Sequence, residues 1–81
     1  MNMTLITTVT SSRTVEIQTD PLAPPLLVTR TALVAASRRA QASATGLANV
    51  SGRFPHGGAG LVTLDEGQIS ELIEDLNRAA S

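Results

Sequence analysis

The chain has 81 residues, a formal net charge of −1 and 42% hydrophobic residues, yet it contains one Phe and no Trp or Tyr. The absence of Cys excludes disulfide bonds and thiolate metal sites, and no apolar run reaches the length of about 20 residues that a transmembrane helix needs. We therefore expect a single domain over residues 1–81 with a thin core of Leu, Ile, Val and Ala. We also expect a homo-oligomer, because small chains often gain stability by association.

The N-terminus lacks the features of a secretory signal. Thr side chains interrupt its apolar residues, and its first charge is Arg13. We therefore expect a cytoplasmic protein that does not bind membranes. All six cationic side chains are Arg and Ala is abundant, a composition typical of a GC-rich genome such as that of an actinobacterium or one of its phages.

Charge is distributed unevenly along the chain. Residues 1–64 contain five Arg and two acidic residues, for a net charge of +3, whereas residues 65–81 contain five acidic residues and one Arg, for −4. Such asymmetry favours docking between subunits, or with another protein, over wholesale binding of nucleic acid. The alternative is that the acidic residues form only a solvated helix face.

The N-terminal part of the chain has the alternation of a β-hairpin. In residues 3–9 and 14–19, successive side chains would fall on opposite faces of an extended chain, and many of them are β-branched. Both features favour strands. In the second run Val15 and Ile17 are predicted to face inward, and residues 11–13 are predicted to form the turn.

The middle of the chain predicts a short strand and a helix. A Pro-rich connection over residues 20–25 ends the second strand, because proline lacks an amide donor and restricts the residue before it. Residues 26–29 then predict a buried third strand, although a helix start has the same pattern. Residues 31–45 lack Gly and Pro and place apolar side chains three or four apart, which predicts a helix that stops at Gly46. Alternation of Ala with polar residues over 40–45 leaves a strand as the alternative.

Residues 46–60 contain five of the six Gly residues, together with Pro55. This composition predicts a Gly-rich loop with positive φ angles rather than regular structure. Residues 61–64 are then expected to form a short strand that leads into the last element.

The C-terminal residues 65–80 predict a capped amphipathic helix. Asp65 can accept hydrogen bonds from the free amides of the first turn, and the Gln68 side chain can return one to the backbone of Asp65, which makes a capping box. Leu64 and Ile69 are placed to pack together as a hydrophobic staple. Apolar residues recur at i, i+3, i+4 and i+7, so that the predicted buried face consists of Ile69, Leu72, Ile73 and Leu76.

These elements predict a small α+β domain, in which an N-terminal β-hairpin and short strands pack with the C-terminal amphipathic helix. The structural alternative is a mostly β protein with one terminal helix, and it depends on residues 31–45 being strand rather than helix.

No residue pattern predicts catalysis, a metal site or a cofactor. The single His, His56, could act in acid–base chemistry or ligand binding, but nothing in the sequence nominates a partner for it. Residues 57–60 match the GxxG of RNA-clamping loops, yet that clamp lies between two helices. The chain also has no Lys for a phosphate-binding P-loop. A tight turn is the simpler interpretation of these glycines.

Two groups of charged side chains and one aromatic residue are candidates for interaction. Arg38 and Arg39, with Arg30 just before the predicted helix, can form a basic stripe for phosphates, or they can pair with the acidic helix within or between subunits. Phe54, the single aromatic residue, either packs against the core and holds the loop in place or is an exposed anchor for a partner. The candidate interaction residues are Arg38, Arg39, Phe54, Glu71, Glu74 and Asp75.

The sequence favours a small non-enzymatic, self-associating protein-interaction module, as expected of a phage-encoded or actinobacterial accessory protein that acts on a host or virion protein. Two alternatives stay open. One is a nucleic-acid-binding regulator that uses the Arg stripe, and the other is a small-ligand binder or enzyme that uses the His56 loop.

Overall fold

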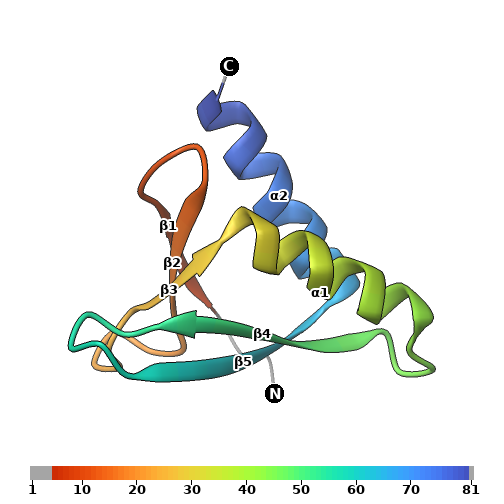
Figure 1. Cartoon of the computed structure of the whole chain (residues 1–81), viewed down its shortest axis with the longest axis horizontal. Helices are drawn as coiled ribbons and strands as arrows, with labels where there is room; N and C mark the ends of the chain where they lie inside the picture. Colours follow the sequence, from red (N-terminus) through yellow and green to blue (C-terminus); the bar gives the residue numbers. More distant parts are fainter. Residues whose placement is uncertain (1–4, 81) are drawn as a thin grey trace.

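The computed structural model describes residues 5–80, which form one antiparallel sheet and two helices (Figure 1). The strands lie in the sheet in the order β1-β2-β3-β4-β5. The predicted α+β class is therefore confirmed. The elements are β1 (Ile6–Val9), β2 (Thr14–Gln18), β3 (Leu26–Thr29), α1 (Arg30–Ala42), β4 (Leu47–Arg53), β5 (Ala59–Asp65) and α2 (Glu66–Ala80).

The predicted N-terminal hairpin is present as β1 and β2. Its register pairs Ile6 with Gln18 and Val9 with Val15. The turn is closed by the amides of Thr10 and Ser11, which both donate to the carbonyl of Thr14. The first residues of the predicted run, 3 and 4, lie outside the described residues.

Strand β3 follows the Pro-rich connection and spans the predicted residues. Its burial alternates, because Leu26 and Val28 are buried while Leu27 is 40% exposed. The strand is thus buried on one face only, and the prediction that it is buried as a whole is wrong. Helices cover one face of the sheet, so the opposite side chains of β3 stay in contact with solvent.

Helix α1 begins directly after β3 and settles the assignment of residues 31–45. Thr29 caps it, since its Oγ1 accepts from the amide of Ala32 at 3.2 Å. The mostly β alternative is wrong, because three apolar residues at helical spacing pack into the core and strong helix formers dominate the segment. The helix ends at Ala42, earlier than predicted, and Gly46 lies in the following turn with φ 71°. The buried residues of α1 are Leu33, Ala36 and Ala40.

The prediction of a loop over residues 46–60 is wrong for most of its length. Strand β4 occupies Leu47–Arg53 and β5 begins at Ala59, which leaves residues 54–58 as the loop. Gly52 lies where β4 comes close to β3, and not in a turn. A Cβ built on Gly52 would lie 2.5 Å from the carbonyl oxygen of Leu27 on β3, so only glycine lets the two strands come together there.

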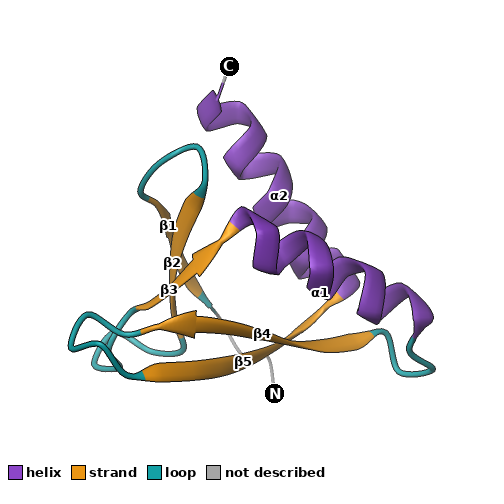
Figure 2. Ribbon diagram, viewed as in Figure 1, coloured by secondary structure: helices purple, strands orange, loops and turns teal. Residues whose placement is uncertain are grey.

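The sheet is strongly bent between its two halves. Strands β3 and β4 share one registered pair, Leu27 with Arg53, and Figure 2 shows the β1–β2 hairpin running across the direction of the β4–β5 hairpin. Both helices contribute buried residues to the single core that lies against this bent sheet. The core consists of Val15, Ile17, Leu26, Val28, Leu33, Ala36, Ala40, Ala48, Val50, Val62, Leu64, Ile69, Leu72 and Leu76.

Helix α2 starts with the predicted capping box. The amide of Gln68 donates to Asp65 Oδ1 at 2.7 Å, and the amide of Asp65 donates to Gln68 Oε1 at 3.0 Å. Leu64 and Ile69, the predicted staple, are both fully buried in the same core. On the predicted inner face Leu72 and Leu76 are also buried, while Ile73 is half-buried against the core.

Replacing Asp65 with Ala removes the acceptor for the first turn of α2. We expect Asp65→Ala to lower the free energy of unfolding by about 1 kcal/mol. Urea denaturation followed by circular dichroism measures the change. Ser70→Ala, at an exposed position of the same helix, should stay within about 0.5 kcal/mol of wild type. Equal effects of the two substitutions would contradict a role for the capping box.

Candidate interaction surface

The predicted charged residues do not pair with one another across the two helices. The guanidinium of Arg39 donates to the backbone carbonyl of Asn49 at 2.6 Å, and so ties α1 to β4. Asp75 forms a salt bridge with Arg78 one turn further along α2. Within residues 5–80 no ion pair joins Arg38 or Arg39 to the acidic residues of α2, so the predicted pairing is absent inside one chain.

The predicted Arg stripe is divided between two sides of α1. Arg30 and Arg38 lie along one shallow surface with Val34 between them, and the Arg30 guanidinium donates to Asn77 Oδ1 of α2. Arg39 points instead toward β4. A continuous row of three free guanidinium groups is therefore not formed.

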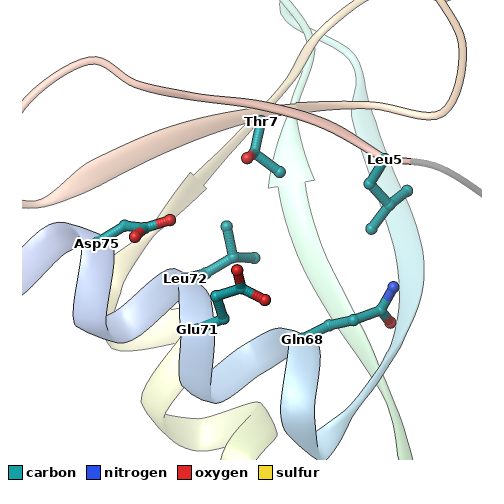
Figure 3. A pocket seen from close by; sticks show the side chains of 6 residues that line it. All are labelled: Leu5, Thr7, Gln68, Glu71, Leu72 and Asp75. Carbon is teal, nitrogen blue, oxygen red and sulfur yellow. The ribbon is translucent and has the colours of Figure 1, made fainter.

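A groove of about 200 Å³ lies between residues 5–7 and α2 (Figure 3). Leu5 and Thr7 line one side, and in Figure 3 the side chain of Leu72 rises toward Thr7 from the helix. The sequence does not single out this groove, because neither Leu5 nor Thr7 belongs to a recognisable motif. Its lining residues are Leu5, Thr7, Gln68, Glu71, Leu72 and Asp75.

The loop that contains His56 is organised around Phe54. The two rings stack with centroids 5.4 Å apart and planes at 22°, and His56 Nδ1 accepts from the amide of Gly58 at 3.2 Å. Phe54 is half-buried against the core. Of its two predicted roles, the structure places it as packing that pins the loop, and both polar and ring contacts of His56 lie within that loop.

Phe54 leaves no room for a side chain on β5 beneath it. A Cβ built on Gly60 would lie 2.6 Å from Phe54 Cε2 and 3.0 Å from Leu26 Cδ1. The glycine at 60 is therefore required by the packing of an aromatic ring, which places it in a strand rather than in a loop.

Gly60→Ala tests this packing. We expect it to lower the free energy of unfolding by about 1–3 kcal/mol through overpacking. In a Phe54→Ala background, where the ring is gone, the same substitution should cost far less, and the difference is a coupling energy that a double-mutant cycle measures. Additive effects would show that the ring does not rest on Gly60.

The face of the sheet opposite the helices carries exposed leucines from three strands. Leu27 of β3 is 40% exposed, Leu47 of β4 is 46% exposed, and Leu61 of β5 is 67% exposed. Glu16 and Arg53 flank Leu27 on the neighbouring strands. The pattern of residues 61–64 predicts that Leu61 lies in a strand, but it does not predict that Leu61 is exposed, because the exposure depends on the place of β5 in the sheet.

Strand β5 is an edge strand, with β4 as its one neighbour in the sheet formed by residues 5–80. The hydrogen bonds just beyond the two ends of the β4–β5 ladder join Glu66 to Gly46 and Phe54 to Gly58. Because hydrogen-bonded pairs alternate in an antiparallel ladder, the even-numbered residues of β5 bond to β4. The amides and carbonyls of Ala59, Leu61 and Thr63 therefore point to the open side.

Other classes of site find no support in the described part of the chain. Residues 5–80 contain no group of three or more His, Asp or Glu side chains arranged to hold a metal ion. No helix among them is long and apolar enough to cross a membrane. No known protein family, curated protein or solved structure matches the chain.

Proposed function

We propose that the protein is a non-enzymatic, self-associating protein-interaction module, and that β5 is the surface through which it associates. The observation that carries this proposal is the position of Leu61. This side chain is two-thirds exposed at the centre of an edge strand, and the strand has no charged residue before Asp65. Proteins that stay monomeric usually protect such an edge with Lys, Pro or a bulge.

Association through β5 compensates for the small core. The described core is built without a fully buried aromatic side chain, and a chain of this length buries a smaller share of its surface than a larger domain does. Complete burial of a leucine stabilises by about 1.5–3 kcal/mol. Two-thirds of the surface of Leu61 is in solvent, so its burial in an interface would add most of this stabilisation.

The other two functions that the sequence left open have weaker support. A nucleic-acid-binding regulator needs a continuous basic surface, whereas Arg39 is directed to Asn49 and Arg30 contacts Asn77. An enzyme or ligand binder at the loop needs His56 to face a second reactive group, whereas its contacts stay with Phe54 and Gly58.

The acidic side chains of α2 suit a second, different partner. Glu71 and Glu74 are exposed, and they lie on a helix separate from the β5 edge. An oligomer that forms through β5 therefore leaves this surface accessible to a basic partner, for which a host or virion protein is our proposal.

Size-exclusion chromatography with light scattering tests self-association. We expect the wild-type protein at micromolar concentration to have twice the 8.4 kDa mass of one chain. Leu61→Lys should give the monomer mass, because it places a charge at the centre of the interface. It should stay folded, because Leu61 packs little within its own chain.

Leu22→Lys is the matched control. Leu22 is 96% exposed and lies in the connection between β2 and β3, so this variant has the same change in charge and hydrophobicity away from β5. It should keep the wild-type mass. A wild-type monomer at all concentrations, or equal loss of association in both variants, would refute the proposal.

A further inference from the structure

We infer that two copies of the chain pair through their β5 strands in an antiparallel register that places Leu61 opposite Leu61 of the second copy. The two sheets then form one continuous sheet. This inference rests on the proposed self-association and goes beyond it, because it specifies the register of the two strands and the residues of β5 that oppose each other.

The length of the open edge centres the pairing on Leu61. At one end the amide of Asp65 is taken by Gln68 Oε1 at 3.0 Å. At the other end the amide of Gly57, the next odd-numbered residue, donates to the carbonyl of Phe54 at 2.9 Å. The groups available to a second strand therefore belong to residues 59–63, and Leu61 is the midpoint of this stretch.

The direction of the backbone groups favours the same register. The alternation of the ladder turns the amides and carbonyls of Ala59, Leu61 and Thr63 away from β4. In the register centred on Leu61, Leu61 opposes itself, and Ala59 opposes Thr63 in both directions. Each opposed pair can exchange two hydrogen bonds, so every open group of the stretch is used.

Registers shifted toward Asp65 use fewer of the open backbone groups. A register centred on Val62 places Ala59 opposite Asp65, whose amide already has Gln68 as its partner. A register centred on Thr63 places Leu61 opposite Asp65, and so sets an apolar side chain against a carboxylate. The register centred on Leu61 avoids Asp65 altogether.

The side chains of β5 agree with this register. On the outer face the two Leu61 side chains would lie directly opposite each other and lose their exposure to solvent. Small Ala59 would lie opposite Thr63, whose hydroxyl donates to Asn49 Oδ1 at 2.7 Å within its own chain. The β4–β5 register runs without a bulge from Leu47–Asp65 to Arg53–Ala59, so the edge is regular enough to serve as a template for pairing.

Single cysteines test the register, because the chain has no Cys of its own. Opposed residues in a hydrogen-bonded pair have Cα atoms about 5.5 Å apart, which lies within the range of about 4.4–6.8 Å for a disulfide. Under mild oxidation, Leu61→Cys should form a disulfide-linked dimer. Thr63→Cys should not link to itself, because its own counterpart lies four residues further along the strand, about 13 Å away.

A mixture of Ala59→Cys and Thr63→Cys keeps Leu61 in both chains and should give the mixed disulfide in excess over either self-linked product. Leu22→Cys, at an exposed position away from β5, sets the rate of cross-linking by random collision. Leu61→Cys should link at least ten times faster than this control.

The outcomes separate this inference from the proposed function. If wild type is a dimer but the mixture of Ala59→Cys and Thr63→Cys gives no excess of the mixed disulfide, or Thr63→Cys links to itself, self-association stands and the Leu61 register is overturned. If wild type is a monomer by light scattering, both are overturned.

Discussion

The antiparallel register of β4 and β5 determines which side chains enter the core, where α2 begins and which backbone groups of β5 stay open. It pairs Leu47 with Asp65 at one end and Arg53 with Ala59 at the other. Because side chains alternate across a sheet, this register turns Val50, Val62 and Leu64 into the core and turns Leu61 to solvent. It also places Asp65, the last residue of β5, where its side chain caps α2. One register therefore determines the core, the cap and the open edge.

The two helices close one face of the sheet and leave the opposite face to solvent. Helix α2 supplies Ile69, Leu72 and Leu76 to the core, while the smaller side chains of α1 allow it to lie close beside the sheet. The exposed leucines all come from the sheet or its connections. Association is therefore expected at the sheet, and the acidic surface of α2 is left for other contacts.

Sequence patterns predicted those elements whose signals are local. The capping box joins residues three apart, and the inner face of α2 repeats at helical spacing, so both can be read within one window of sequence. The strand at Leu47–Arg53 could not be predicted in this way, because Gly52 is required by the carbonyl of Leu27, a residue remote in sequence. The contact of Arg39 with Asn49 and the exposure of Leu61 likewise depend on which strands become neighbours.

Amide hydrogen exchange across a range of protein concentrations tests pairing through β5, since it reports on the open edge of this strand in the wild-type chain. We expect the amides of Ala59, Leu61 and Thr63 to exchange rapidly in dilute solution and to become protected as concentration rises. The amides of Val62 and Leu64, which bond to β4, should be protected throughout. Exchange at the three odd-numbered positions that does not depend on concentration would contradict pairing through β5.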